Sequence, residues 1–288
     1  MRRVLRLPVG VSRTVVVVQG SSLLVLGGLA PGDSTTSRVW RVDPATHRVT
    51  VSRPLALAVH DASGAALAGS AYVFGGGAAT TVATVQQWTA RGGRRVAALP
   101  APRSDSAAAV VGGTAYVVGG FDGRGMTRDV LATTDGRVFR KVARLAIGVR
   151  YPAVAAVGGA VYVVGGELAT TEGTLAGGQT SAVQRVDPRT GHVTVVGHLS
   201  RPLGHATAFS VGGRLFVAGG RHGATATSSL VVVDPATGHD RRIASLPYVV
   251  SDAGVAVSGA TAWLVGGETS GPAAPVATVL ALTSTVTK

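Results

Sequence analysis

Ionisable residues recur at one position of a repeated Gly-Gly motif, and their side chains could carry acid–base or ligand-binding chemistry. The Gly-Gly pairs begin at positions 27, 75, 119, 165, 219 and 266. Fourteen residues before the first glycine of each pair, the sequence has Arg13, Asp61, Asp105, Tyr151, His205 and Asp252. Carboxylates, an imidazole, a phenol and a guanidinium are groups that hydrogen-bond polar ligands and exchange protons with them.

Two neighbouring positions of the same register add further charged groups. One residue earlier lie His60 and Arg150, and two residues after the first glycine lie Glu167, Arg221 and Glu268. If the repeats share one structure, all these side chains surround one opening. The predicted binding residues are Arg13, His60, Asp61, Asp105, Arg150, Tyr151, Glu167, His205, Arg221, Asp252 and Glu268.

Two interpretations of this polar ring stay open. In the first it binds a ligand: arginines would pair with a carboxylate, and His205, Glu167 and Arg221 are the candidate catalytic residues for proton transfer. In the second the ring is structural, because the inner strands of a channel need polar groups and water to satisfy free backbone atoms. Neither interpretation requires a metal or another cofactor.

The elements that position these residues are short strands in a sixfold repeat. The Gly-Gly pairs recur every 44 to 54 residues, so six repeats use the whole chain. In each repeat two apolar runs flank a tight glycine turn, as in 107–111 and 115–118, which predicts a hairpin buried on both faces. A third and a fourth strand follow, joined by turns such as Asp187-Pro188-Arg189-Thr190.

Six such sheets predict an all-β fold: a six-bladed β-propeller of four-stranded antiparallel blades, forming one domain over residues 1–288. The sixth repeat has strands near 254–257, 262–265 and 276–282 but no clear fourth strand. The segment 1–8 is similar to the fourth-strand segment 240–247, so the N-terminal strand is predicted to close the last blade. Residues 1–30 also resemble a secretion signal, but the repeat register explains them as strands.

The repeat resembles the kelch family in its period near 50, its Gly-Gly pair after an apolar strand and its four strands per blade. It departs from the family pattern because most of the Tyr and Trp residues that follow the pair are missing. Among kelch-like propellers, the radical-copper oxidases need a cysteine, and this chain has none. The iron-binding specifier proteins need a Glu-x3-Asp-x3-His spacing that is absent. Sialic acid mutarotases are most similar in size and blade number, although no local motif matches.

Charge and composition limit the partners. The net charge is +13, from 27 basic and 14 acidic residues, and an acidic cell-envelope polymer is a possible partner. No basic stripe with interleaved aromatic residues indicates specific nucleic-acid binding. The mean hydropathy is +0.35, yet no apolar run reaches the ~18 residues of a membrane span. We expect a monomer that is secreted or extracytoplasmic, with a cytoplasmic location as the alternative.

These observations predict a binding module that takes a protein or glycan ligand through its loop face and channel mouth. The alternative is an isomerase similar to the sugar mutarotases, and a third class is a purely structural envelope module. The longest repeat contains a Gly/Thr-rich loop at 168–180, which is a candidate lid with Gly177-Gly178 as its hinge.

Overall fold

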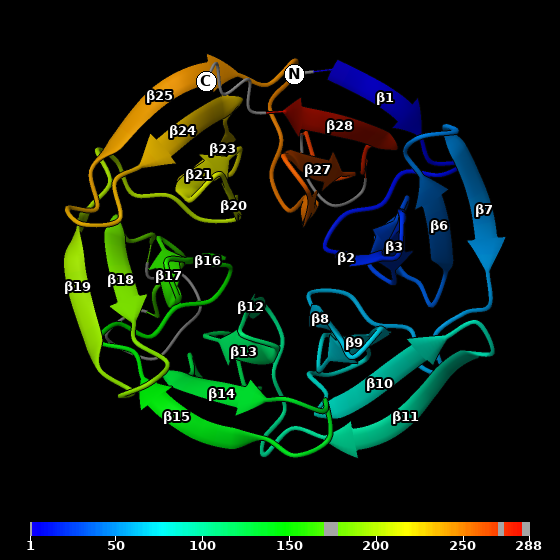
Figure 1. Cartoon of the computed structure of the whole chain (residues 1–288), viewed down its shortest axis with the longest axis horizontal. Coiled ribbons are helices and arrows are strands. Elements are labelled where there is room, and N and C mark those ends of the chain that lie inside the picture. Colours follow the sequence, from blue (N-terminus) through cyan, green and yellow to red (C-terminus); the bar gives the residue numbers. More distant parts are fainter. Residues whose placement is uncertain (1, 170–177, 270–273, 284–288) are drawn as a thin grey trace.

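The structure is a computed structural model that describes residues 2–169, 178–269 and 274–283. Within these ranges all repeating secondary structure is β-strand and there is no α-helix. Six four-stranded antiparallel sheets stand around a central axis like the blades of a wheel (Figure 1). The predicted all-β, six-bladed propeller is confirmed. No helix in the described part of the chain is long and apolar enough to cross a membrane.

The first three blades follow one another along the chain, and each runs from its innermost to its outermost strand. Blade 1 contains β2 (Val15–Gln19), β3 (Ser22–Leu26), β6 (Val39–Asp43) and β7 (Arg48–Ser52). Blade 2 contains β8 (Ser63–Leu67), β9 (Ser70–Phe74), β10 (Thr84–Thr89) and β11 (Gly92–Ala98). Blade 3 contains β12 (Ala107–Val111), β13 (Thr114–Val118), β14 (Asp129–Thr133) and β15 (Arg140–Arg144).

The other three blades repeat this order, and the last one borrows a strand from the N-terminus. Blade 4 contains β16 (Ala153–Val157), β17 (Ala160–Val164), β18 (Ala182–Val186) and β19 (Val193–His198). Blade 5 contains β20 (Thr207–Val211), β21 (Arg214–Ala218), β24 (Ser229–Val233) and β25 (Asp240–Ser245). Blade 6 contains β26 (Gly254–Ser258), β27 (Thr261–Val265), β28 (Thr278–Thr283) and β1 (Arg2–Arg6).

The wheel closes as the sequence predicts. Strand β1 pairs antiparallel with β28, from Arg2 opposite Ala281 to Arg6 opposite Thr278. The Leu7 N–H then donates to the Ala277 carbonyl at 2.7 Å, which extends the pairing by one residue. In Figure 1 the blue β1 lies at the rim outside the red β28. The N-terminal segment therefore covers an edge that would otherwise expose unpaired backbone groups.

The hydrophobic core lies between neighbouring blades rather than inside a single one. Val15 and Val17 of β2 pack in a cluster with Trp88 of blade 2, whereas Val16 packs on the opposite side with Val265 of blade 6. Successive residues of a strand point to opposite faces. An inner strand that is buried on both faces therefore reads as an unbroken apolar run, which confirms the prediction drawn from these runs.

The Gly-Gly pairs allow neighbouring blades to approach closely. Gly165 has φ +62°, and a Cβ built on it would lie 2.2 Å from the carbonyl oxygen of Leu203. The next glycine, Gly166, donates its N–H to that same carbonyl at 2.8 Å. A side chain at the first glycine would push the segment that contains Leu203, and that enters blade 5, away from the Gly-Gly pair. The motif therefore couples one blade to the next.

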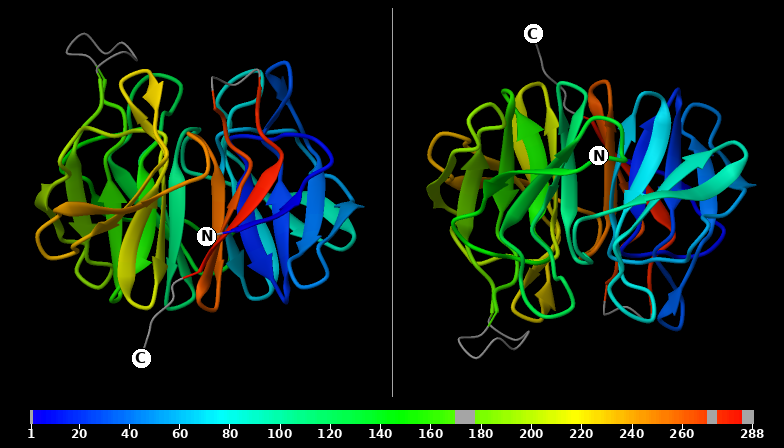
Figure 2. Two further views of the ribbon diagram at one scale, coloured as in Figure 1. Left: turned by 90° about the horizontal axis from the view of Figure 1, so that it is seen from above. Right: turned by 90° about the horizontal axis from the view of Figure 1, so that it is seen from below.

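Two kinds of loop meet on one face of the disc. The connection that enters each blade forms a β-bridge with the loop that follows its second strand, as between Arg150 and Glu167. Two of the loops contain short hairpins, one of β4 (Leu29–Ala30) and β5 (Ser34–Thr35), the other of β22 (Arg221–His222) and β23 (Thr225–Ala226). In Figure 2 these loops project together at one end of the channel. The candidate lid at 168–180 lies mostly outside the described residues, and so does Gly177 of its hinge.

Candidate functional site

The six residues of the predicted ring have an unusual backbone conformation. Each one is left-handed although none is a glycine, with φ between 49° and 57°: Arg13, Asp61, Asp105, Tyr151, His205 and Asp252. Each donates its N–H to the carbonyl of the ring residue one blade earlier, at 2.8 to 3.2 Å, and Arg13 closes the circle by donating to Asp252. Left-handed backbone costs a non-glycine residue ~1–2 kcal/mol. The closed circle of hydrogen bonds offsets that strain at every position.

This backbone circle bears on the structural interpretation of the ring. The ring N–H and C=O groups satisfy one another, so they do not need the ring side chains as partners. The hydrogen bonds described for the carboxylates come instead from other side chains; for example, Asp61 accepts from Arg13 and from Tyr151. The side chains are therefore free to converge on the axis and interact there.

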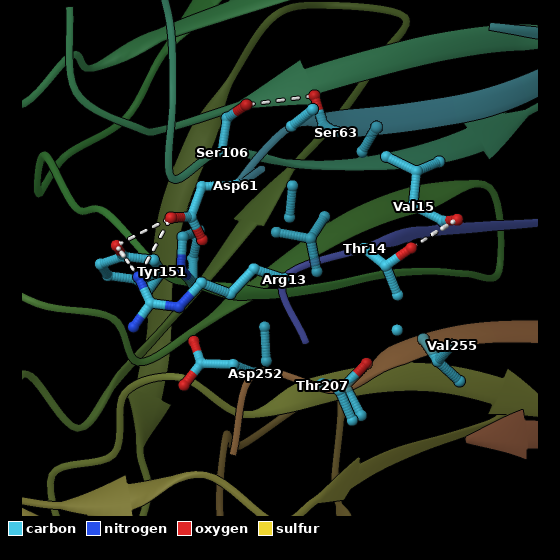
Figure 3. A pocket seen from close by; sticks show the side chains of 18 of the residues that line it. Arg13, Thr14, Val15, Asp61, Ser63, Ser106, Tyr151, Thr207, Asp252 and Val255 are labelled. Carbon is cyan, nitrogen blue, oxygen red and sulfur yellow. Dashed lines mark hydrogen bonds and ion pairs between the residues drawn. The ribbon is translucent and has the colours of Figure 1, made fainter. Parts of the chain in front are cut away.

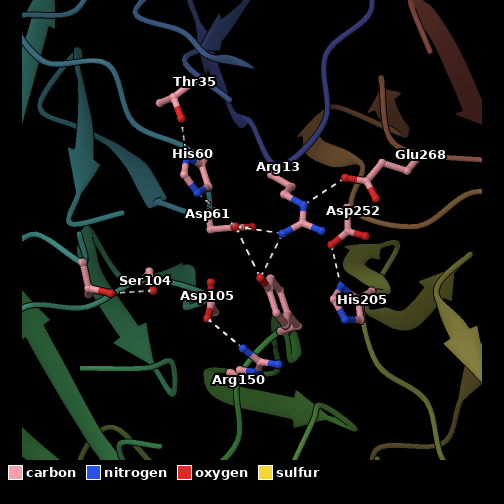
Figure 4. A network of polar contacts seen from close by, with 12 residues as sticks. Arg13, Thr35, His60, Asp61, Ser104, Asp105, Arg150, His205, Asp252 and Glu268 are labelled. Carbon is pink, nitrogen blue, oxygen red and sulfur yellow. Dashed lines mark hydrogen bonds and ion pairs between the residues drawn. The ribbon is translucent and has the colours of Figure 1, made fainter. Parts of the chain in front are cut away.

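Arg13 connects blade 1 to three other blades across the mouth. Its Nε donates to Glu268 Oε1 at 2.9 Å, and its Nη1 donates to Asp61 Oδ2 at 3.1 Å and to the Tyr151 hydroxyl at 3.0 Å (Figures 3 and 4). Burial alone lowers the pKa of an arginine, but the charges of Asp61 and Asp252 outweigh it and raise the pKa of Arg13 further above its usual value. The guanidinium is thus a fixed cation at the centre of the mouth.

Arg221 continues the network from the loop after β21. Its Nη2 lies 2.7 Å from Glu268 Oε2 and 3.5 Å from Asp252 Oδ2, and its Nε donates to Ser251 Oγ at 2.9 Å. Glu268 is fully buried, and it bridges two arginines, one on each carboxylate oxygen. Such charge-assisted pairs fix the geometry of both partners.

His205 is held between two carboxylates. Its Nδ1 lies 2.7 Å from Asp252 Oδ1 and its Nε2 lies 2.8 Å from Glu167 Oε1. Burial opposes the charged form, but the attraction of Asp252 and Glu167 prevails and raises the pKa of His205 to about 9. Both nitrogens therefore act as donors, and the ring is an imidazolium stacked on Tyr151 with 4.0 Å between centroids.

The network ends at two neighbouring carboxyl groups. Arg150 Nη2 lies 2.7 Å from Glu167 Oε2 and its Nη1 lies 3.7 Å from Asp105 Oδ2. Burial, followed by the charge of Asp61, raises the pKa of Asp105 to about 7, and burial likewise raises the pKa of Asp61. We call this set the charge chain, in which anions and cations alternate: Asp61, Arg13, Glu268, Arg221, Asp252, His205, Glu167, Arg150 and Asp105.

The charge chain borders a cavity, and its charged groups in the loops after the Gly-Gly pairs all come from one half of the wheel. A cavity of about 160 Å³ is lined by all six ring residues and by the residues that begin the inner strands. Blades 4 to 6 supply charged groups after the Gly-Gly pair, whereas the equivalent residues of blades 1 to 3 are Leu29, Gly77 and Phe121. His60 fills the space above Gly77, with its Nε2 3.8 Å from Asp61 Oδ2.

The structure brings all eleven predicted site residues to this mouth. Ten of them belong to the charge chain or, like Tyr151, contact it directly, and His60 flanks it. The predicted binding residues did not include Ser251, which accepts from Arg221, or Thr35, whose Oγ1 lies 2.8 Å from His60 Nδ1 (Figure 4). Ser251 occupies the same repeat position as His60 and Arg150, so the repeat register by itself places it at the mouth. No group of three or more histidine and acidic side chains in the described ranges is arranged to hold a metal ion.

Comparisons with known proteins agree with this architecture. A family model described as "Kelch motif" matches residues 102–132, which extend from the entry of blade 3 into its third strand. The solved structure of YjhT superposes with a TM-score of 0.83 at 15% identity, covering 98% of this chain and 97% of that one. No curated protein matches the sequence.

By its fold the chain is a six-bladed β-propeller, and at 15% identity the likeness to YjhT supports this fold alone. With the kelch motif in its third blade and the Gly-Gly repeat in all six, it is a kelch-repeat propeller. As such it has the architecture of a general interaction module.

Proposed function

We propose that this propeller binds a carbohydrate at the channel mouth on its loop face. The observation that carries the proposal is the alternation of donors and acceptors along the charge chain, whose arginines keep 15% to 20% of their side-chain surface exposed. A sugar hydroxyl both donates and accepts, so neighbouring hydroxyls suit neighbouring carboxylates and guanidiniums. The partly exposed Phe121, in the loop after the second strand of blade 3, offers an apolar surface that suits the C–H face of a sugar ring.

The test is a glycan array followed by calorimetry on the best ligand. Removing a charge-assisted hydrogen bond costs ~1.5–3 kcal/mol, so Arg150→Ala and Arg221→Ala should each weaken binding at least tenfold. The matched control is Arg144→Ala, because Arg144 lies on the outermost strand of blade 3 with 62% of its side chain exposed. A glycan whose affinity is unchanged by both mouth variants would bind elsewhere, and the absence of any glycan ligand would overturn the proposal.

A second candidate function, sugar isomerisation, is favoured by one observation, the pKa of Asp105. A group that titrates near 7 can take a hydroxyl proton and return it to a ring oxygen at neutral pH. The proton acceptor expected from the sequence was His205 or a carboxylate. Because both nitrogens of His205 face carboxylates, Asp105 is the better candidate.

Exchange spectroscopy tests this second function. If the propeller is an isomerase, it should accelerate the interconversion of the α and β anomers of a free sugar in NMR exchange spectra. Asp105→Asn should then reduce the acceleration at least a hundredfold, and the double variant His205→Ala/Glu167→Ala should also lose it. Arg144→Ala again serves as the control. An exchange rate equal to the uncatalysed rate across a panel of sugars would exclude the function.

A further inference from the structure

One position of the third strand differs between the blades in a way that opens a cleft in blade 5. The residue at this position pairs with the second-strand residue that lies two places before the first glycine of the Gly-Gly pair. In blades 1 to 6 it is occupied by Trp40, Gln86, Leu131, Gln184, Val231 and Leu280. Five of these side chains are at most 3% exposed, whereas Val231 is partly exposed.

The two glutamines show what this position can do. Gln86 Oε1 accepts from the N–H of Leu57 at 2.8 Å, and Gln86 Nε2 donates to the carbonyl of the same residue at 3.1 Å. Gln184 makes the same pair of bonds with Ile147, at 2.9 and 3.1 Å. Leu57 and Ile147 both lie four residues before the ring residue of their blade. Each glutamine thus holds one exposed bend of the connection that enters its blade.

The equivalent bend in blade 5 is present but has no such side chain. Arg201 lies four residues before His205, and residues 200–201 form the same bend as residues 56–57 and 146–147. Among the described residues, no hydrogen bond is found for the N–H or the carbonyl of Arg201. Valine at position 231 is too short to reach them.

A cleft of about 380 Å³ lies beside the shorter side chain of Val231. Its apolar floor contains Val231, Val217 and Leu203. Its polar rim contains Arg201, Ser200, Asp240, Arg242, Ser229, Thr227 and His222. Asp240 accepts from the N–H of Ser200 at 2.6 Å, which fixes the residue next to Arg201. The cleft therefore has a positioned bend on one side and an apolar floor for a short aliphatic stem.

We propose that this cleft binds a primary carboxamide, the group at the end of a glutamine or asparagine side chain. The bound amide would make the same two hydrogen bonds to the backbone of Arg201 that Gln86 and Gln184 make within their own blades. Bonding to the N–H and the carbonyl of one residue requires an N–H on the same side as the amide oxygen. A primary amide has such an N–H, whereas a trans secondary amide, including the N-acetyl group of a sugar, directs its N–H away from the oxygen.

Propionamide, which is the free glutamine side chain, is the probe. In 15N-edited NMR spectra of the full chain, we expect it to shift the Arg201 amide in a saturable way with a millimolar dissociation constant, as a ligand of five heavy atoms allows. N-methylpropionamide is the matched control, because it keeps the stem and the carbonyl but lacks the N–H on the carbonyl side. It should bind at least tenfold more weakly.

Two variants of Val231 complete the test. Val231→Gln should satisfy the bend from within, raise the melting temperature and abolish propionamide binding. Val231→Leu introduces the leucine that blades 3 and 6 have at this position. It should abolish binding without forming hydrogen bonds to the bend at Arg201. Val232→Leu, one residue along the same strand, should leave binding unchanged.

Equal binding of the two amides would overturn the proposal, as would unchanged propionamide binding in either folded Val231 variant. If neither variant folds, the comparison of the two amides on the wild-type chain still decides the question. None of these residues belongs to the charge chain, so the outcome is independent of the function proposed for the mouth.

Discussion

At the scale of single residues, the mouth is organised by the order of its charges. Five carboxylates meet three guanidiniums and one imidazolium, and the unpaired excess falls on the two neighbouring acids, Asp61 and Asp105. Burial penalises a second negative charge there, so the pair retains a proton to a higher pH than an isolated carboxyl would. The same arrangement gives the mouth its group that titrates near neutrality.

The raised pKa of Asp105 predicts a pH-dependent effect of Asp105→Asn. The folded-state pKa of about 7 lies above the ordinary value of 3.8, so this group's contribution to stability is fully present below pH ~4 and is lost as the pH rises through 7. Asparagine resembles the protonated form and escapes that loss. We expect the variant to be more stable than the wild type by up to ~4 kcal/mol at pH 8 and nearly equal to it at pH 4.

Urea denaturation of both proteins at the two pH values measures this difference. The control is Asp135→Asn, because Asp135 caps an exposed turn through the N–H groups of Arg137 and Val138, and its pKa is lowered by those bonds. That variant should instead be less stable than the wild type at pH 8. If the difference in unfolding free energy between wild type and Asp105→Asn does not change with pH, the pKa of Asp105 is not raised in the folded protein.

At the scale of the elements, the glycines of each hairpin have two different roles. The turn glycine Gly158 has φ +57°, and a Cβ built on it would meet no atom within 4 Å. Gly165, at the end of the same hairpin, has φ +62° but lies against the carbonyl of Leu203. Backbone conformation alone requires a glycine at position 158, whereas both conformation and packing require one at position 165.

Alanine substitution should separate these two roles. Gly158→Ala should cost ~1 kcal/mol of unfolding free energy, the usual cost of left-handed backbone for a residue with a Cβ. Gly165→Ala should cost ~3 kcal/mol or more, because the added methyl group must also displace the connection that enters blade 5. Chemical denaturation of the pair measures the difference, and equal losses would mean that blade contact does not explain the Gly-Gly motif.

At the scale of the whole molecule, stability depends on closing the wheel. The core lies between blades, so each blade needs a neighbour on both sides, and an open wheel would expose two apolar faces. Strand β1 contributes the outer strand of blade 6, and Leu7 just after it is 3% exposed in the cluster between blades 6 and 1. The first few residues of the chain therefore stabilise a contact with its other end.

Deleting residues 1–7 should consequently destabilise the whole propeller. Removing the buried Leu7 side chain alone costs ~2–5 kcal/mol, and the loss of the β1–β28 pairing adds to it. We expect a markedly lower melting temperature, with partial recovery when a synthetic peptide of residues 1–8 is added. A deletion that leaves the melting temperature unchanged would show that β1 is not needed for closure.

Much of this architecture could be predicted from the sequence, because it follows from local rules repeated six times. The Gly-Gly period fixed the number of blades, and the similarity of segments 1–8 and 240–247 revealed the closing strand. The ring residues could be predicted because equivalent positions of equivalent repeats converge on one axis. Ser251 and Thr35 were not among the predicted binding residues because serine and threonine are common in loops and carry no charge to single them out.

The amino-acid sequence by itself determined the wheel, the position of the ring and the types of side chain in it, since these depend on periodicity and on residue chemistry. Only the tertiary structure decided how the side chains pair, that His205 lies between two acids and that the charge chain ends at Asp61 and Asp105. It also revealed the cleft beside Val231. These features depend on distances between residues of different blades, which are far apart in the sequence and are brought together only when the wheel closes.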